Sequence, residues 1–409
     1  MSVRRLEVWL DHQHVASIDA KQPWALKARY TAEVVESLPG NSPLLSCSLP
    51  VTRQWQDASW WARGLLPEGA HLLALATRAK VPTNYTSDLL ARYGRDIAGA
   101  FTLTAGPPPD ARRWAVEEYT GDQLADELRN SATEPGFATR DDSELSLAGL
   151  QNKILVVHLG PARWGRPVNG HPSTHIMKLD DPQRPGLIEA EHSCLTLANT
   201  VGLTTIRPQF THIDGIPVLI VNRFDRIEGP DGAIGRLHQE DACQALAANL
   251  DDGGGRGKYE NAGGPSFAAI AQLLEQHATD PAAELAQLLR LAVFTTVIGN
   301  SDAHGKNVSF LIDTSAGTIS LAPAYDTVPT ALWPTLRRTA AMTTNGLHSI
   351  VATRDDLIAE AGIWGVGRTR ADAIIEAFTD SLEAAVADLP IRPDVAELIG
   401  ARTRVMLSN

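Results

Sequence analysis

Alternating apolar and polar residues, the pattern typical of half-buried strands, recur in two parts of the chain. The first part covers residues 1–105 and carries several short runs of this kind. In the second part the pattern predicts strands at residues 153–159, 175–179 and 218–224, and a helix at 189–201. We therefore expect a small sheet with one helix in the second part.

After Gln239 the spacing of apolar residues becomes mainly helical. Helices are predicted at residues 240–250, 266–276 and 282–298. The last of these is apolar on nearly every face, as is typical of the buried central helix of a bundle. The pattern as a whole indicates the α+β class, with a sheet-rich lobe followed by a mainly helical lobe.

Three consecutive prolines, at residues 107–109, interrupt regular structure and indicate a domain boundary. A chain of 409 residues also exceeds the size that one hydrophobic core usually supports. We expect three domains, at residues 1–105, 140–240 and 241–409.

Composition narrows the class of protein. Hydrophobic residues make up 44% and charged residues 21%, which is typical of a soluble globular protein, and we expect no membrane-spanning segment and a cytoplasmic location. The three cysteines lack metal-ligand spacing, so we expect them to be reduced and buried. A net charge of -12 repels nucleic-acid phosphates, so any contact with DNA would need a basic partner or a local basic patch.

The polar stretch 299–307 directly follows the predicted buried helix and precedes a predicted strand, 308–312. It carries Asp302 and, five positions later, Asn307. Protein kinases use this Asp-x-x-x-x-Asn spacing, in which the Asp orients the acceptor hydroxyl and the Asn binds a magnesium ion. The spacing alone is weak evidence, because Asp and Asn are also common turn residues.

Asp326 extends the candidate site. Residues 313–317 resemble a hairpin turn, and 318–322 a returning strand. Because a hairpin brings its two ends together, Asn307 before it and Asp326 after it are expected at the same edge. A carboxylate and an amide oxygen suit magnesium, whose remaining ligands are waters and nucleotide phosphates.

A kinase also needs a cation for the phosphates and a backbone loop around them. Lys178 ends a predicted strand and is the natural cation, with Glu189 or Glu191 as its predicted partner. Residues 146–153 precede a strand and offer backbone N–H groups to phosphates. His304 lacks a second His or Cys at ligand spacing, so we expect it to contact phosphate or to order the loop.

The segment 251–259 superficially matches a Walker phosphate-binding loop. The match fails because Asp252 stands at the position of the first glycine, and Tyr259 stands at the position of the hydroxyl that binds magnesium. We interpret the segment as a flexible acidic loop.

Taken in order, the motifs resemble those of HipA-type toxin kinases across nearly the whole chain. They are residues 146–153, 175–178, 221–226, 238–241, 299–307 and 321–326, and in the first domain 65–69 and 94–100. The resemblance implies a two-lobed protein-kinase-like fold with an extra N-terminal domain, residues 140–240 being the nucleotide-binding lobe and 241–409 the catalytic lobe.

It further implies a serine/threonine kinase that uses ATP and Mg²⁺, acts as a toxin and is neutralised by a DNA-binding, helix-turn-helix antitoxin of the HipB type. Its protein substrate would be a translation factor such as an aminoacyl-tRNA synthetase. By motif, Asp302 would be catalytic, Asn307 and Asp326 would bind metal, and Ser146 would be autophosphorylated. The implied nucleotide contacts are Ala148, Gly149, Leu150, Gln151, Asn152, Lys153, Lys178, Asn222, Phe224, Gln239 and His304.

Two positions depart from the family pattern. Asn222 stands where an acidic residue is expected, and Asn152 stands where Glu is usual. A backbone contact to adenine tolerates the first change, whereas the second concerns the conformation of the phosphate loop and the phosphorylation of Ser146. Phosphate on Ser146 would add a charge of about -1.5 to -2 beside that loop and would repel ATP.

Two alternative functions stay open at the level of sequence. One is a small-molecule or lipid kinase with the same Asp302, Asn307 and Asp326, although such an enzyme would not require the first domain. The other is a binding protein that holds the antitoxin and assists repression, with weak or vestigial catalysis; the acidic net charge suits a basic partner.

Overall fold

The computed structural model describes residues 2–108, 110–133, 152–230, 232–250 and 255–408. The chain divides into two compact units. Unit 1 comprises Met1–Asp181, Thr211–Glu240 and Ile312–Gly317, and unit 2 comprises Pro182–Phe210, Asp241–Leu311 and Thr318–Asn409.

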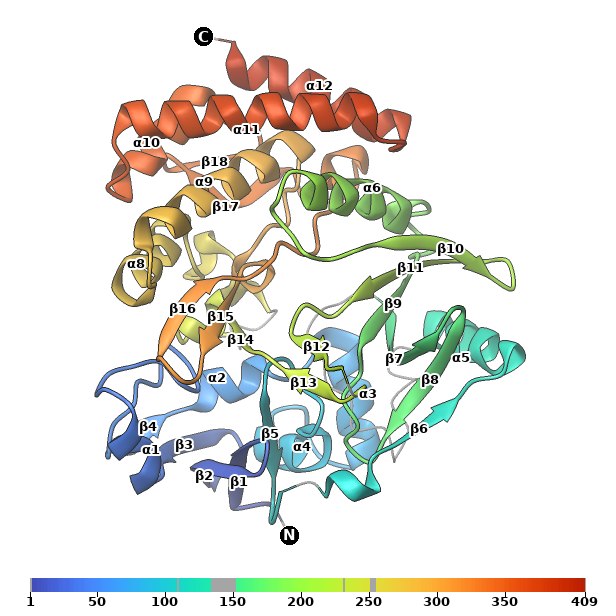
Figure 1. Ribbon diagram of the computed structural model, residues 1–409, viewed down its shortest axis with the longest axis vertical. Helices are drawn as coiled ribbons and strands as arrows, with labels where there is room; N and C mark the ends of the chain where they lie inside the picture. The colour runs from blue at the N-terminus through green and yellow to red at the C-terminus, as the bar shows by residue number, and fades with distance from the viewer. Residues whose placement is uncertain (1, 109, 134–151, 231, 251–254, 409) are drawn as a thin grey trace. The chain divides into compact units, whose positions relative to one another are not determined.

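Unit 1 begins with a five-stranded sheet in the order β4-β3-β2-β1-β5 (Figure 1). Its elements are β1 (Arg5–Leu10), β2 (Gln13–Gln22), β3 (Ala25–Tyr30), α1 (Ala32–Ser37), β4 (Gln56–Asp57), α2 (Ser59–Gly64), α3 (Gly69–Ala79), α4 (Thr86–Tyr93) and β5 (Phe101–Thr104). A hydrophobic core that includes Leu6, Trp61 and Phe101 is formed within residues 6–103. The first part of the chain therefore has a core of its own.

A second, six-stranded sheet has the order β10-β11-β9-β7-β8-β6. The elements are β6 (Ala115–Glu118), α5 (Gly121–Thr133), β7 (Lys153–Gly160), β8 (Arg163–Val168), β9 (His175–Leu179), β10 (Gln209–Ile213) and β11 (Ile216–Asn222). Its core includes Leu128 of α5, Met177 and Val218. The predicted strands at 153–159, 175–179 and 218–224 are confirmed, but the sheet is larger than expected, and the pattern did not indicate α5.

Short strands complete unit 1 and lead into unit 2. They are β12 (Arg226–Glu228), β13 (Ile234–Arg236) and β14 (His238–Asp241). A helix was predicted at 240–250, and this prediction is wrong: α7 covers only Ala242–Ala245. Asp241 and Gln244 form a capping box at its start, but Ala247 adopts a left-handed φ of 49° and ends the helical path.

Unit 2 is mainly helical. Its main elements are α6 (Leu187–Thr200), α8 (Phe267–His277), α9 (Pro281–Ile298), β15 (Ser309–Asp313), β16 (Thr318–Leu321), β17 (Thr339–Thr344), β18 (Leu347–Ser349), α10 (Arg354–Ile363), α11 (Arg368–Asp388) and α12 (Pro393–Leu407), with 3-10 turns at Arg256–Lys258, Glu260–Ala262, Gly305–Asn307 and Thr330–Leu332. The helices α8, α11 and α12 pack against α9 (Figure 1). The predicted central helix is confirmed.

The local sequence explains both ends of α9. The Asp280 side chain accepts a hydrogen bond from the backbone N–H of Ala283, and Pro281 occupies the first turn, where its missing N–H costs nothing. The helix stops at Gly299, whose φ of 68° suits glycine. The candidate catalytic loop thus starts from a sharply defined point on a buried helix.

The same helix bears on the membrane prediction. We expected no segment apolar enough to span a membrane, yet α9 meets that criterion by length and composition, with a mean hydropathy of 1.3. A buried core helix passes the same test, and 56% of α9 is buried within the protein. The helix is therefore weak evidence for a membrane span.

Candidate active site

Asn300 links the two segments that carry the candidate catalytic residues. Its side-chain oxygen accepts a hydrogen bond of 3.0 Å from the backbone N–H of Asp302, and its amide nitrogen donates one of 3.2 Å to the backbone oxygen of Asp326. The hairpin between these segments also closes as predicted, since the N–H of Ala322 donates to the oxygen of Ser309 at 2.8 Å. Asp302 and Asp326 are thereby held in one region of unit 2.

The amide of Asn307 has a defined orientation. Its nitrogen donates a hydrogen bond of 3.1 Å to the backbone oxygen of Asp302. The opposite side of the amide therefore presents the oxygen Oδ1, the atom that can bind a cation. Asp302 and Asn307 are brought together as the five-residue spacing suggested.

Asp326 adopts a left-handed backbone conformation, with a φ of 50°. This region is uncommon for residues other than glycine, although Asp tolerates it better than most. The Asp326 carboxylate lies near enough to raise the pKa values of both Asp302 and His304 electrostatically. A metal ion would offset this concentration of negative charge.

Asp302 is half-buried, and burial is the main cause that raises its pKa. Three groups act in the opposite direction: a 2.7 Å hydrogen bond from the hydroxyl of Tyr259, and the positive charges of Lys258 and Arg337. These groups favour the ionised carboxylate, which is the form that accepts a proton.

His304 is buried, and its pKa is lowered well below the usual value by burial and by the charges of Lys258 and Lys306. The imidazole is therefore neutral. Its Nδ1 atom is buried and has no hydrogen-bond partner among the described residues. A ligand in this region would find an unsatisfied polar atom on His304.

In unit 1, the candidate phosphate-binding lysines occupy one face of the sheet. Lys153 of β7 and Lys178 of β9 are directly opposite each other in the antiparallel pair, and Lys178 is only 6% exposed. Like charges in this relationship repel, so an anion such as phosphate would be favoured beside them. A pairing of Lys178 with Glu189 or Glu191 would join the two units and stays a prediction.

Asn222 ends β11, and Phe224 follows in a tight turn between two buried charged residues. Arg223 donates to Asp225 at 3.0 and 2.8 Å, and Arg226 donates to Asp96 at 2.9 Å. The predicted hinge for adenine is thus fixed to the first domain by an internal ionic network. Desolvation opposes the charged form of Asp225, but the two arginines dominate and lower its pKa.

The structure describes the surroundings of some of the other predicted nucleotide contacts, and the remaining contacts lie outside the described residues. The buried Oε1 atom of Gln239 has no hydrogen-bond partner among the described residues. Asn152 donates to the backbone oxygen of Ala132 at 3.2 Å. Ser146, Ala148, Gly149, Leu150 and Gln151 lie outside the described residues.

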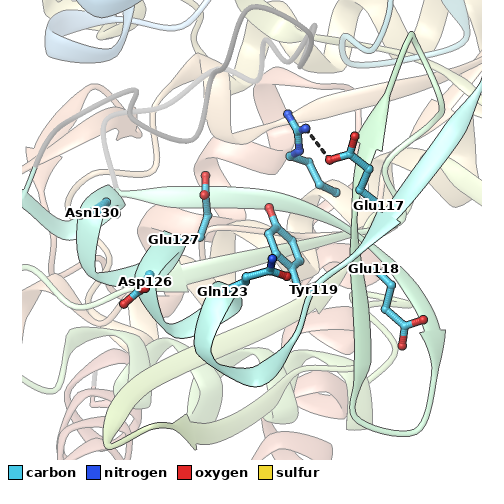
Figure 2. A pocket seen from close by; sticks show the side chains of 8 residues that line it. Glu117, Glu118, Tyr119, Gln123, Asp126, Glu127 and Asn130 are labelled. Atoms are coloured by element: carbon cyan, nitrogen blue, oxygen red, sulfur yellow. Dashed lines mark hydrogen bonds and ion pairs between the residues drawn. The ribbon is translucent and has the colours of Figure 1, made fainter.

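A pocket of about 340 Å³ opens elsewhere in unit 1, between β6 and α5 (Figure 2). It is lined by Glu117, Glu118, Tyr119, Gln123, Asp126, Glu127, Asn130 and Arg166, and Glu117 accepts a hydrogen bond of 2.6 Å from Arg166. None of the predicted site residues lines it. Four carboxylates against one guanidinium would repel nucleotide phosphates, so this pocket does not suit ATP.

The described residues hold no group of three or more His, Cys, Asp or Glu side chains arranged to bind a metal. A dedicated zinc or calcium site of that kind is therefore not formed by the described part of the chain. One carboxylate and one amide still fit magnesium, which is commonly held by few protein ligands together with phosphates.

Comparison with protein families adds an independent observation. A family model described as the HipA-like C-terminal domain matches residues 145–386, and one described as the HipA N-terminal domain matches residues 6–104. The chain belongs to the HipA family.

Individual relatives agree with this assignment. A Sinorhizobium fredii protein named "Putative kinase Y4mE" is 34% identical over 84% of this chain and 81% of its own length. The protein named "Serine/threonine-protein kinase toxin HipA" of Shewanella oneidensis is 27% identical over 73% of this chain and 69% of its own length. A solved complex of Shewanella oneidensis HipA, HipB and operator DNA matches with a TM-score of 0.79 and 23% identity, over 98% of this chain and 96% of that one. The HipA fold thus extends along nearly the whole chain.

Sequence reasoning missed two sets of residues that support the candidate site. The sequence predicts only a flexible loop around Tyr259, although Tyr259 contacts Asp302. It places Asp96 and Arg226 in two separate motifs, and their contact spans 130 positions. For Asp96 and Arg226, the signal available in the sequence was a charged residue beside apolar residues in each of the motifs 94–100 and 221–226.

Proposed function

We propose that this HipA-family chain is an ATP- and Mg²⁺-dependent serine/threonine protein kinase. The observation that carries the proposal is the orientation of Asn307, whose amide nitrogen is engaged by the backbone of Asp302. The oxygen of Asn307 and the carboxylate of Asp326 would bind Mg²⁺. The ion would neutralise charge on the ATP phosphates.

In this proposal the oxygen of the substrate hydroxyl attacks the γ-phosphorus of ATP, and Asp302 accepts the proton of that hydroxyl. The bond between the γ-phosphorus and the bridging oxygen breaks, and ADP leaves. Lys153 and Lys178 supply positive charge for the phosphates, and Gln239 and His304 offer unsatisfied buried atoms to the nucleotide. Asn222 and Phe224 would contact adenine through their backbone.

The test of catalysis uses the purified full chain with labelled ATP and a bacterial lysate, with Mg²⁺ or with excess EDTA. Asp302→Ala should abolish incorporation of label. Asp380→Ala removes an exposed carboxylate from α11 of the same unit and should leave it unchanged. Absence of label on any protein with the unaltered chain would favour the role of an antitoxin-binding protein.

We further propose that the chain is the toxin of a toxin-antitoxin pair and that its substrate is a translation factor such as an aminoacyl-tRNA synthetase. The family membership supports this role, and the net charge of -12 suits a basic, helix-turn-helix antitoxin. Coexpression with a HipB-like helix-turn-helix protein, sought among the neighbouring open reading frames, should restore growth and yield a complex that retards operator DNA. Retardation by this chain alone would contradict the proposal that DNA is reached only through the antitoxin.

Ser146 is proposed as an autophosphorylation site that reduces nucleotide affinity. The charge of a phosphate on Ser146 would repel the ATP phosphates from the loop that residues 148–153 are proposed to form. The dissociation constant for ATP should be higher for the phosphorylated form than for Ser146→Ala. Equal constants would contradict the regulatory role while leaving the kinase proposal intact.

A further inference from the structure

Tyr259 makes a direct hydrogen bond to the candidate catalytic carboxylate. Its hydroxyl donates to Oδ1 of Asp302 at 2.7 Å, and both residues belong to unit 2. A carboxylate has two oxygens. The bond from Tyr259 engages Oδ1, and the second oxygen, Oδ2, points away from Tyr259. An acceptor hydroxyl needs only one oxygen of Asp302 to receive its proton.

The aromatic ring of Tyr259 is held by two neighbours. The guanidinium of Arg337 lies over one face at 4.4 Å from the ring centre, and His304 packs against the ring edge-on at 5.3 Å. A cation above an aromatic face is attracted by the ring quadrupole, and an edge-on aromatic pair is a favoured geometry. The ring therefore has a defined orientation relative to Asp302.

The backbone that carries Tyr259 is also fixed. The oxygen of Tyr259 accepts from the N–H groups of Ala262 and Gly264, at 3.0 and 2.9 Å. A Cβ atom on Gly264 would come within 2.8 Å of the nitrogen of Tyr259, so the turn closes tightly. A turn closed in this way holds Tyr259 in a fixed position next to Asp302.

The residue after Tyr259 fastens the same turn to β17. The carboxylate of Glu260 accepts hydrogen bonds from the backbone N–H of Thr343 at 2.5 Å and from its hydroxyl at 2.8 Å. Two charge-assisted bonds to one strand residue limit movement of the whole turn. Tyr259 is thus supported from the ring, from its own turn and from its neighbour.

We propose that Tyr259 is a positioning residue, which holds the carboxylate of Asp302 in the orientation needed to receive the proton of the acceptor hydroxyl. This inference rests on the proposed kinase function and deepens it. Arg337 completes the arrangement, because its positive charge acts on Asp302 while its guanidinium holds the ring of Tyr259.

The role predicts a specific kinetic signature for Tyr259→Phe, which removes the hydroxyl and retains the ring. The kcat should fall about tenfold, because a hydrogen bond to a charged group is lost. The KM for ATP should stay unchanged, since Tyr259 is not proposed to touch the nucleotide.

Tyr85→Phe is the matched control, since it removes a hydroxyl from a tyrosine of unit 1 that contacts Trp24. It should leave kcat and the KM for ATP unchanged. Thermal unfolding of each variant checks that the fold is retained. Unchanged kcat in Tyr259→Phe would overturn the proposal, and faster turnover would overturn it too, because it would show that the hydroxyl blocks the acceptor.

A second measurement separates this inference from the kinase proposal. The carboxyl ¹³C chemical shift of Asp302 is recorded in nucleotide-free, aspartate-labelled protein at one fixed pH, with Asp302→Asn to assign the signal. A chemical shift in Tyr259→Phe that differs from that of the unaltered chain supports the positioning role even if no phosphoryl transfer is found, and equal values overturn it. Phosphate on Tyr259 in mass spectra would also overturn it, because the residue would then be an acceptor.

Discussion

Lys306 and Asp241 form an ion pair of 2.8 Å in the interior of unit 2, and both side chains are almost completely removed from solvent. Lys306 lies in the candidate catalytic loop, between Asp302 and Asn307, whereas Asp241 caps the short helix α7. The hydroxyl of Tyr325, next to Asp326, donates to the backbone oxygen of Lys306 at 2.7 Å. The pair therefore anchors the loop on which catalysis is proposed to depend.

Lys306→Met should lower the free energy of unfolding by about 3–5 kcal/mol, because it leaves the Asp241 carboxylate buried without its cation. The double variant Lys306→Met/Asp241→Asn should recover part of the loss, since the remaining amide is neutral and still caps α7. Urea unfolding measures both effects. Arg368→Met, at an exposed pair with Asp355, is the control and should lower the free energy of unfolding by no more than about 1 kcal/mol. If Lys306→Met lost as little stability as this control, the anchoring role would be contradicted.

Asn307→Ala should raise the Mg²⁺ concentration needed for half-maximal phosphoryl transfer by at least about tenfold, because it removes a proposed ligand and the bond that orients it. Asn307→Asp keeps an oxygen ligand but loses the donor to the backbone of Asp302, and an intermediate effect is expected. Magnesium titrations at saturating ATP provide the comparison. Asn84→Ala, at an exposed position of unit 1, is the control. A Mg²⁺ requirement unchanged in Asn307→Ala would exclude this residue as a ligand.

Gly305→Ala should reduce activity more than stability. A Cβ atom at Gly305 would come within 2.4 Å of the ring of Pro265 and 3.0 Å of the sulfur of Cys243, so the catalytic loop must shift. Relief of such short contacts requires the loop to move by about 1 Å, and a displacement of about 1 Å near reacting groups can cost about 100-fold in rate. Gly362→Ala, which meets nothing within 4 Å and lies in α10, should stabilise the protein by about 0.5–1 kcal/mol. Steady-state assays and thermal unfolding separate the two effects.

His238 should make stability depend on pH. It is buried in unit 1, and burial lowers its pKa from 6.5 to about 4. Its Nε2 atom lies 2.9 Å from the backbone oxygen of Leu45, which can only accept, so this nitrogen carries the proton of the neutral ring. The folded state therefore resists a second proton that the unfolded chain takes up.

The stabilisation from neutral His238 is complete above the unfolded pKa and is lost as the pH falls from about 6.5 to about 4. The shift corresponds to about 3 kcal/mol at most. Urea unfolding at pH 7, 5.5 and 4.5 should show this decline, and His238→Gln should flatten it. His348→Gln, at an exposed position, should leave the slope unchanged; an equal flattening there would contradict the assignment to His238.

Elements with strong local periodicity were predicted well from the sequence. The strands β7 and β9 and the helix α9 follow from alternating or helical apolar patterns, with Asp280 and Gly299 marking the ends of α9. The helix expected at 240–250 was wrong, because Ala247 takes a left-handed conformation that no glycine signals. The mismatch of segment 251–259 to a phosphate-binding loop gives no indication of the contact between Tyr259 and Asp302, which are 43 positions apart.

The sequence by itself determined the order of the motifs, the five-residue spacing of Asp302 and Asn307, and the hairpin that precedes Asp326. These features depend on neighbours along the chain, whose geometry is set by local backbone preferences. The tertiary structure alone decided that Asp241 pairs with Lys306 across 65 positions, that Tyr259 supports Asp302 across 43, and that Arg226 meets Asp96 across 130. Such pairs form because buried charges require partners wherever the fold supplies them, and no spacing in the sequence encodes that requirement.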